Sequence, residues 1–419
     1  MGNNKNIDVL IIGAGPAGVA AGIGAKKEGA ENVVVLERDW DLGGILQQCI
    51  HTGFGLRIFR EELTGPEYMH RFITEAREAG VEFRADTMVF KIDKENNSVW
   101  TMNKERGIEC LNPKSIVLAM GCRERPLGAI HIPGTRPSGI YTAGTAKHFV
   151  NKEGCMPGKR VVILGSDNIG LIMARRMILE GAEVEGVYEM MSWPGGLRRN
   201  IAQCLDDYGI PLHLKMTVTK IHGADRLEGV TVAEVDDNMT PIKGTERFIE
   251  CDTLLLAIGL IPENELSKMA GIEIDPVTGG PVVNDLLQTS NPAVFAAGNV
   301  VIVYDLVDKV SDEGLIAGAN AAKFVAGKIS PDIKKIPVKG GQNVRLFSPQ
   351  FITGEKDAII YLRVTHPIER ACKVTAEPGL YTQRLRYARP GEMNEARIKA
   401  SAIKANPNLK EITIDIQPM

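Results

Sequence analysis

The sequence has no closely spaced pair of cysteines. Its seven cysteines are scattered through 419 residues, and none lies in a C-x-x-C pair. Disulfide frameworks, zinc sites and iron–sulfur sites need regularly spaced cysteines, so this odd and unspaced set is more typical of reduced thiols in a cytoplasmic protein. The sequence therefore predicts no metal site, and it favours a cytoplasmic location.

A strong net charge and a long apolar run are also missing. The formal net charge is -3, with 24% charged and 44% hydrophobic residues, which is ordinary globular composition and suggests no nucleic-acid role. The apolar stretch 9–25 is rich in glycine, contains Pro16, is short for a membrane span and lacks a basic segment before it. Neither a membrane span nor a signal peptide is expected. The length predicts two to three domains.

Residues 7–37 have the pattern of an apolar strand, a glycine-rich turn (GAGPAG), a helix and a second strand that ends in an acid. In such a βαβ unit, Gly13 permits the tight turn and Gly18 lets the helix pack closely on the strand. Gly15 lets backbone N–H groups and the helix N-terminus approach a pyrophosphate. Glu37 can accept hydrogen bonds from both ribose hydroxyls. Together these features predict a dinucleotide site rather than a plain glycine-rich turn.

A second unit of the same design spans residues 160–189, with the turn GSDNIG at 165–170 and a terminal Glu189. Asp167 stands where the second glycine is expected, and its carboxylate adds bulk and negative charge against a pyrophosphate. Glu189 would favour the free 2′-hydroxyl of NAD over the 2′-phosphate of NADP. Two interpretations stay open: a working NAD(H) site, or a Rossmann-shaped domain that has lost its nucleotide or binds another one.

Two buried strands that end in small-residue turns, 115–121 and 253–259, predict the crossings between two domains. Segment 289–299 resembles the strand and turn that, in FAD-dependent oxidoreductases, brings an acidic residue to the flavin. That residue is Asn299 here, and its amide can hydrogen-bond a ribityl hydroxyl. Segment 314–325 then predicts a helix whose N-terminus faces the flavin pyrimidine and stabilises negative charge on the reduced ring.

The last part of the chain, residues 331–419, predicts a small β-rich domain. The expected strands are 358–364, 380–387 and 412–416. This segment has 15 Lys plus Arg against 9 Asp plus Glu, a balance of +6 that leaves -9 for the remainder. Arg384, Arg386 and Arg389 cluster near two tyrosines. They indicate either a solvated face or a docking surface for an acidic partner protein.

Residues 7–330 resemble the pyridine nucleotide-disulfide oxidoreductase type of flavoprotein. Four segments resemble a branch of it without redox cysteines: 43–51 (GGILQQCIH), 123–126 (RERP), 142–146 (TAGTA) and 170–176 (GLIMARR). That branch includes FAD/NAD oxidoreductase subunits partnered with glycerol-3-phosphate dehydrogenase-like flavoproteins. More distantly, it includes the larger subunits of dye-linked proline dehydrogenase and hydrogen cyanide synthase. Disulfide reductases of this type carry a cysteine pair soon after the ribose-binding acid, whereas only Cys49 is available here.

The resemblance implies an enzyme that moves electrons between NAD(H) and a partner through FAD, in a glycerol-3-phosphate dehydrogenase-like complex. The implied partner is a flavoprotein dehydrogenase subunit or a small iron–sulfur or Cys-rich protein, so a hetero-oligomer is expected. One alternative is a subunit of an amine or amino-acid dehydrogenase, such as one for proline or sarcosine, with a vestigial or non-NAD nucleotide site. Another is a scaffold whose FAD is structural. No side-chain catalytic residue is expected, because the flavin carries the chemistry.

The expected fold class is α/β, with two Rossmann-like dinucleotide-binding domains, the second inserted in the first, and a small C-terminal β-rich domain. The expected boundaries are 1–122 and 259–330 for the FAD-binding domain, 123–258 for the inserted NAD(H)-binding-like domain and 331–419 for the C-terminal domain. The residues expected around FAD are Gly13, Ala14, Gly15, Pro16, Ala17, Gly18, Glu37, Arg38, Gly44, Ile45, Gln48, His51, Val89, Ala119, Gly121, Gly298 and Asn299. Those expected around NAD(H) are Gly165, Asn168, Ile169, Gly170, Glu189 and Gly259.

Overall fold

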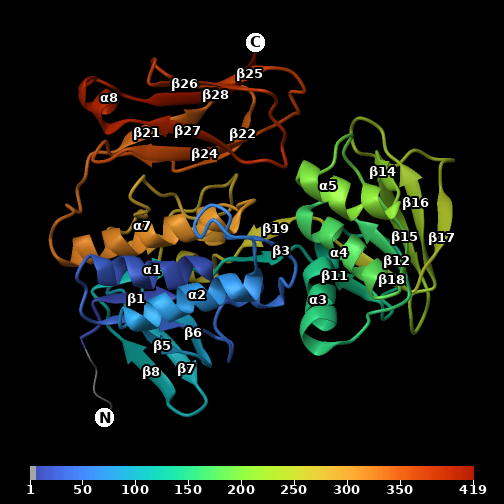
Figure 1. Cartoon of the computed structure of the whole chain (residues 1–419), viewed down its shortest axis with the longest axis horizontal. Helices are drawn as coiled ribbons and strands as arrows, with labels where there is room; N and C mark the ends of the chain where they lie inside the picture. Colours follow the sequence, from blue (N-terminus) through green and yellow to red (C-terminus); the bar gives the residue numbers. More distant parts are fainter. Residues whose placement is uncertain (1–5) are drawn as a thin grey trace. The chain divides into compact units, whose positions relative to one another are not determined.

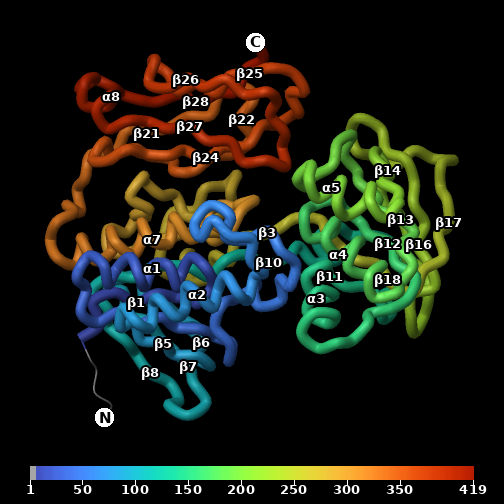
Figure 2. The backbone as a smooth tube through the Cα atoms, in the orientation of Figure 1, coloured from blue at the N-terminus to red at the C-terminus, as the bar shows by residue number. Residues whose placement is uncertain are grey.

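The computed structural model describes residues 6–419, which form two compact units. One unit contains the chain up to Cys122 and from Pro262 onward, and the other is the insert, Arg123–Ile261. The chain crosses between them in β10 (Cys122–Glu124) and β19 (Leu260–Pro262), and its path can be followed in Figure 2. The return crossing thus lies a few residues beyond the expected position, and segment 331–419 belongs to the same compact unit as the first Rossmann-like domain.

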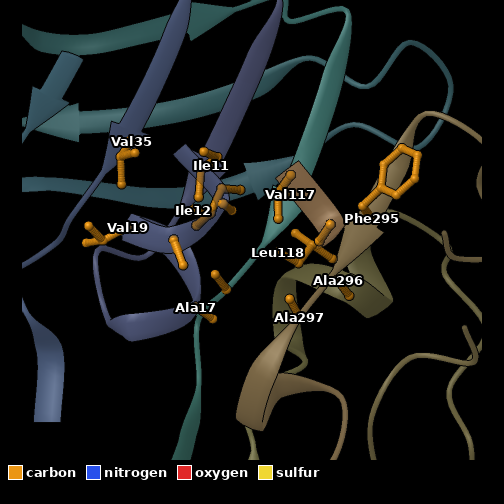
Figure 3. Close-up of a cluster of buried hydrophobic side chains, with 14 of the residues drawn as sticks. Ile11, Ile12, Ala17, Val19, Val35, Val117, Leu118, Phe295, Ala296 and Ala297 are labelled. Carbon is orange, nitrogen blue, oxygen red and sulfur yellow. The ribbon is translucent and has the colours of Figure 1, made fainter. Parts of the chain in front are cut away.

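The first unit is built on a parallel sheet. Its strand order is β20 (Val294–Ala296), β9 (Ser115–Leu118), β1 (Val9–Ile12), β2 (Val33–Leu36) and β5 (Glu82–Arg84). Every residue of β1, β2 and β9 is buried, as expected for strands covered on both faces. Figure 3 shows Ile11, Val117 and Phe295 in this core, on three neighbouring strands.

Helix α1 (Pro16–Lys27) lies beside α7 (Val307–Val325) along its length (Figure 1). Small residues allow this close approach, because a Cβ on Gly318 would lie 1.8 Å from the carbonyl oxygen of Ala21. The remaining elements of this domain are η1 (Gly44–Gln48), β3 (Thr52–Phe54), β4 (Leu63–Thr64), α2 (Gly65–Glu78), β6 (Thr87–Ile92), β7 (Val99–Asn103), β8 (Gly107–Leu111), α6 (Glu265–Met269) and η5 (Gly298–Val300). Strands β6, β7 and β8 form an antiparallel sheet.

The insert repeats the Rossmann-like design. Its parallel sheet has the order β11 (Ile140–Thr142), β18 (Thr253–Leu256), β12 (Arg160–Leu164), β13 (Glu183–Glu189) and β14 (Leu212–Leu214). Its helical segments are α3 (Ala143–His148), η3 (Phe149–Glu153), α4 (Asn168–Leu179), α5 (Arg198–Cys204) and η4 (Asp206–Tyr208), and η2 (Leu127–Ala129) precedes them. An antiparallel sheet follows, made of β15 (Met216–His222), β16 (Gly229–Glu234) and β17 (Arg247–Glu250). The predicted α/β fold with one Rossmann-like domain inserted in another is therefore confirmed.

The C-terminal segment is β-rich, as predicted. One sheet has the order β23 (Phe351–Ile352), β21 (Ile336–Gly340), β28 (Ile412–Pro418), β25 (Cys372–Glu377) and β26 (Tyr381–Leu385). A second sheet contains β22 (Val344–Ser348), β24 (Ala358–Val364) and β27 (Asn394–Ile398), and α8 (Ala400–Lys404) precedes β28. Arg384 and Arg386 are exposed, whereas the guanidinium of Arg389 is 2.8 Å from the carboxylate of Glu369. The predicted basic cluster therefore contains two exposed arginines and one that is paired within the protein.

Helix α7 begins at Val307, seven residues before the predicted start at Gly314. Its first turns carry charged side chains that are buried, and the C-terminal segment helps to bury them. The ammonium of Lys309 lies 3.2 Å from Asp305 and 3.8 Å from Glu395 of β27. The predicted placement of the helix N-terminus at Gly314 was therefore wrong. Among residues 6–419, no helix is long and apolar enough to cross a membrane.

Candidate nucleotide-binding sites

The first turn is fixed between two strands of the parallel sheet. Gly13, at the end of β1, has φ of 101°, and its N–H donates to the carbonyl of Leu36 over 2.8 Å. A Cβ at Gly13 would lie 2.5 Å from the carbonyl oxygen of Ala119, at the end of β9. Only glycine satisfies both the backbone angle and the space. The chain therefore turns sharply from β1 into α1, as the fingerprint predicts.

The acid at the end of the second strand is aimed at this turn. Glu37 Oε2 accepts a hydrogen bond from the N–H of Ala14 at 2.8 Å, and Oε1 accepts one from the N–H of Asp39 at 2.9 Å. A carboxylate has about four acceptor positions, so two remain for the hydroxyls of a ribose. The backbone thus fixes the carboxylate of Glu37 beside the turn, and its contact with a ribose stays a prediction.

The N-terminus of α1 is open. Gly15 is the N-cap residue, with φ of -73° and ψ of -174°, and no side chain caps the helix there. No atom lies within 4 Å of the position that a Cβ on Gly15 would take. The N–H groups of Ala17 and Gly18 belong to the first turn of the helix, which has no carbonyl partners for them in an α-helix. Such a turn is suited to bind a phosphate group.

Segments far apart in the sequence flank this turn. A Cβ on Gly44 would lie 3.2 Å from the Cα of Gly15, and one on Gly298 would lie 2.9 Å from the Cβ of Ala17. The structure therefore brings Gly44 and Gly298 to the turn. Arg38 is exposed just beyond Glu37, Ile45 and His51 lie at or near the surface, Gln48 and Val89 are buried, and Gly121 has φ of 72°. For these six, contact with the flavin stays a prediction.

Asn299 has partners within the chain. Its Oδ1 accepts a hydrogen bond from the N–H of Tyr304 at 3.0 Å, and its Nδ2 lies 3.6 Å from Cys122 Sγ. These contacts hold the segment that leads into α7, so a contact with the ribityl chain also stays a prediction. Glu313, which sequence reasoning missed, accepts hydrogen bonds from the N–H of Gly298 at 3.0 Å and from the hydroxyl of Tyr304. Burial raises the pKa of Glu313 to about 7.

The second turn repeats the backbone contacts of the first. Gly165 has φ of 95°, its N–H donates to the carbonyl of Tyr188 over 2.8 Å, and a Cβ on it would lie 2.0 Å from the carbonyl oxygen of Ala257. Glu189 Oε2 accepts from the N–H of Ser166 at 3.0 Å, as Glu37 does from the second residue of its turn. The two fingerprints therefore share one design from the turn through the terminal acid.

The two turns differ at Asp167, which occupies the position of Gly15. Its φ of -69° and ψ of 170° are close to those of Gly15, and its Oδ1 accepts from the N–H groups of Ile169 at 3.0 Å and Gly170 at 2.9 Å. The carboxylate thus takes the two amides that are open in the first turn. Burial raises the pKa of Asp167 to about 6, and the negative charges of Glu124 and Glu189 act in the same direction.

The loop after β13 folds over the second turn. The N–H of Gly195 donates to Ser166 Oγ at 2.8 Å, and the N–H of Leu197 donates to Asn168 Oδ1, also at 2.8 Å. Asn168 therefore holds the loop in this structure. Gly259, with φ of 99°, accepts a hydrogen bond from the N–H of Arg125 at 3.0 Å. The only sequence signal for this loop is a Pro-Gly-Gly run, which is typical of many surface turns.

Comparisons with known proteins place the chain in a family. Residues 7–322 match the family model described as pyridine nucleotide-disulphide oxidoreductase. Dihydrolipoyl dehydrogenase of Caenorhabditis elegans is 25% identical, with 80% of this chain and 71% of that protein covered. Hydrogen cyanide synthase subunit HcnB of Pseudomonas protegens is also 25% identical, with 78% and 69% covered. The latter confirms the predicted relationship to hydrogen cyanide synthase.

Solved structures agree on the fold. A thioredoxin reductase of T. acidophilum superposes with a TM-score of 0.63 and 24% identity, with 77% of this chain and 99% of that chain covered. Members of the matched family bind FAD and use NAD(P)H, so the prediction of an FAD-dependent enzyme that uses a nicotinamide nucleotide is confirmed at the level of the family. The first turn, with its open amides and fixed acid, fits FAD. This chain belongs to the pyridine nucleotide-disulphide oxidoreductase family.

Proposed function

We propose that this protein is the FAD-carrying subunit of an oxidoreductase complex, in which it transfers electrons between NAD(H) and a partner flavoprotein or iron–sulfur protein. The first nucleotide turn carries this proposal, because its amides are open, its acid is fixed and only one cysteine follows that acid before Cys110. FAD supplies hydride and electron transfer when bound. The residues of the chain bind and orient it, with Glu37 toward the ribose and the N-terminus of α1 toward the pyrophosphate.

The state of Cys49 supports a mechanism without a thiol. Cys49 is 5% exposed, and its Sγ donates to the carbonyl of Ile45 at 3.3 Å. A dithiol relay needs two cysteines within reach of each other and a reactive, accessible thiolate. A buried thiol that hydrogen-bonds its own helical turn lacks the accessibility such a relay requires. A disulfide of this chain is therefore not the acceptor in this proposal, which assigns that role to another protein.

The proposed partner follows from the relatives and from charge. HcnB is by name a subunit, and we extend that property to this chain as part of a glycerol-3-phosphate dehydrogenase-like complex. The C-terminal segment has a balance of +6, and Arg384 and Arg386 are exposed on or next to the edge strand β26. Exposed positive charge of this kind speeds docking of an acidic protein.

The direct test is anaerobic rapid mixing of the purified, flavin-loaded protein with NADH. We expect the flavin absorption to bleach faster with NADH than with NADPH, because Glu189 would repel a 2′-phosphate. Glu189→Gln is the matched variant, and it should reduce the preference for NADH. A dye added afterwards should recover the flavin absorption by accepting the electrons. Absence of bleaching by either nucleotide would overturn the NAD(H) part of the proposal.

A second candidate function is favoured by Asp167. If its carboxylate keeps the inserted domain free of nucleotide, the flavin receives its electrons from an organic substrate, such as an amine or amino acid, within an assembled complex. The discriminating measurement is the same bleaching experiment on a complex purified from the native host. Bleaching by proline or sarcosine but not by NADH would establish this candidate instead.

A further inference from the structure

The two nucleotide turns provide an internal comparison within one chain. Both N-cap residues have nearly the same backbone angles, -73° and -174° at Gly15 against -69° and 170° at Asp167. Both turns contact the ends of their neighbouring strands through equivalent backbone hydrogen bonds. The backbone at the N-cap is therefore alike in the two turns, and the side chain at this position decides whether the first amides of the helix are open.

The carboxylate of Asp167 makes the contacts that a phosphate group makes at the N-terminus of such a helix. It accepts from the second and third N–H groups after the N-cap, those of Ile169 and Gly170, at 3.0 and 2.9 Å. In the first turn, the equivalent N–H groups belong to Ala17 and Gly18, and no side chain caps them. A pyrophosphate at the second turn would have to displace the carboxylate, since both compete for the same donors.

We propose that Asp167 is an internal occupant of the second nucleotide turn, and that a dinucleotide binds there only when Asp167 takes up a proton and releases these amides. This inference rests on the proposed function, because NAD(H) is taken as the ligand of the insert. It adds a regulatory property to that site: affinity for the dinucleotide rises as pH falls.

Burial and the charged neighbours of Asp167 favour this coupling. Its charged neighbours are Glu124 of β10 and Glu189 at the end of β13. Their negative charges disfavour the ionised form of Asp167 and would also repel a phosphate. Glu124 Oε1 is held in place by the N–H of Gly144 in α3, at 2.7 Å. Within α4, the amides of Ile169 and Gly170 stabilise the ionised form of Asp167 and so act against proton uptake. Burial and the two carboxylates outweigh them, which places the transition near pH 6.

Proton uptake by Asp167 offsets part of the negative charge that a dinucleotide brings to the turn. A dinucleotide brings two negative charges in its pyrophosphate to a turn that already holds three carboxylates, those of Asp167, Glu124 and Glu189. Uptake of one proton from solvent by Asp167 removes one of these charges and turns an acceptor into a possible O–H donor toward a phosphate oxygen. No oxidant, reductant or covalent step is involved.

The test is a binding measurement on the flavin-loaded protein with NAD⁺, which cannot reduce the flavin. Isothermal calorimetry gives Kd over a pH series, and two buffers of different ionisation enthalpy give the number of protons taken up. For the wild type, we expect Kd to rise by up to about tenfold per pH unit above about pH 6, with about one proton taken up per NAD⁺ bound at the higher pH values.

Three variants separate the effect of the Asp167 charge from the effect of its helix cap and from effects common to any substitution in the insert. Asp167→Gly should bind NAD⁺ more tightly and without this pH dependence, because it recreates the first turn. Asp167→Asn keeps a good helix cap and removes the charge, so it should lose the pH dependence even if the Gly variant folds poorly. Asp207→Asn, an exposed carboxylate of the insert, is the control and should behave as wild type.

The possible results distinguish this inference from the proposed function. Wild-type binding that is independent of pH and equal to that of Asp167→Gly would overturn the inference and leave the NAD(H) function standing. Binding by Asp167→Gly alone would support the internal occupant and overturn NAD(H) as a ligand of the wild type. Binding by no variant at any pH would overturn both.

Discussion

Gly15→Asp should place a carboxylate on the open amides of the first turn, as Asp167 does in the second. It should therefore remove FAD from the protein while the fold persists. The backbone of Gly15 already has the conformation of Asp167, and no atom lies within 4 Å of its Cβ position. An aspartate can therefore enter without a clash in the apoprotein. Its carboxylate should accept from the N–H groups of Ala17 and Gly18, as Asp167 does from its own helix.

The expected effects on stability and on binding have opposite signs. The aspartate should stabilise the apoprotein by only a few tenths of a kcal/mol, roughly, because glycine is itself a tolerated N-cap residue. The pyrophosphate of FAD would lose two hydrogen bonds to a charged group, each worth about 1.5–3 kcal/mol. The sum of about 3–6 kcal/mol corresponds to a Kd for FAD about 10²–10⁴ times higher, before any repulsion between like charges is counted.

Two measurements check this prediction. Flavin absorbance and fluorescence titration of the apoprotein give the FAD content and Kd, and thermal unfolding of the apoprotein gives the stability. Gly15→Ala is the matched control, because it adds a Cβ without a carboxylate and should lose less affinity than the aspartate variant. If Gly15→Asp retains FAD with wild-type affinity, the N-terminus of α1 is not the pyrophosphate site, and the comparison between the two turns fails.

Cys49→Ser should leave NADH-to-dye electron transfer within a few-fold of wild type, whereas a loss of about a hundredfold, or about 2.7 kcal/mol in the barrier, would require a thiol mechanism. Because the folded-state pKa of Glu313 is raised from 4.5 to about 7, the stability it contributes is complete below about pH 4.5 and is lost as pH rises through about 7. Thermal unfolding across that range should show this fall, and a Glu313→Gln variant whose curve falls as steeply as the wild type would contradict it. Arg384→Glu/Arg386→Glu should slow association with the partner but leave flavin reduction by NADH unchanged. Pull-down yields equal to those of the wild type at every salt concentration would show that these arginines only contact solvent.

The local sequence pattern was sufficient to predict the parts of the fold that are built from consecutive residues. The first turn, the strand before it and Glu37 form one continuous βαβ unit, so spacing alone predicts their arrangement. The same holds for strand β24, whose observed bounds, Ala358–Val364, are those expected from its apolar run. Burial of consecutive apolar residues leaves few alternatives for such segments.

Local pattern failed where distant segments supply the partner. Asp308, Lys309 and Glu313 lie outside the helix expected at 314–325, but each is buried in α7. Lys309 is buried because Asp305 and Glu395 neutralise it, and Glu395 is 86 residues further along the chain. Asn299 has a partner close in sequence, because its oxygen accepts a hydrogen bond from the N–H of Tyr304, and its contact with a ribityl hydroxyl stays a prediction.

The second turn shows why the fold and the ligand must be argued separately. Its strand, glycine, helix and acid all adopt the geometry of the first turn, so the likeness of the two folds does not tell whether both bind a nucleotide. Affinity, however, depends on whether two amide groups are available, and one carboxylate decides that without moving the backbone. A helix cap such as Asp167 also stabilises the insert, so its domain can remain folded whether or not a nucleotide binds. Because of this cap, the stability of the domain does not depend on a bound ligand. Nucleotide binding there can therefore become regulated, or be lost, without unfolding the domain.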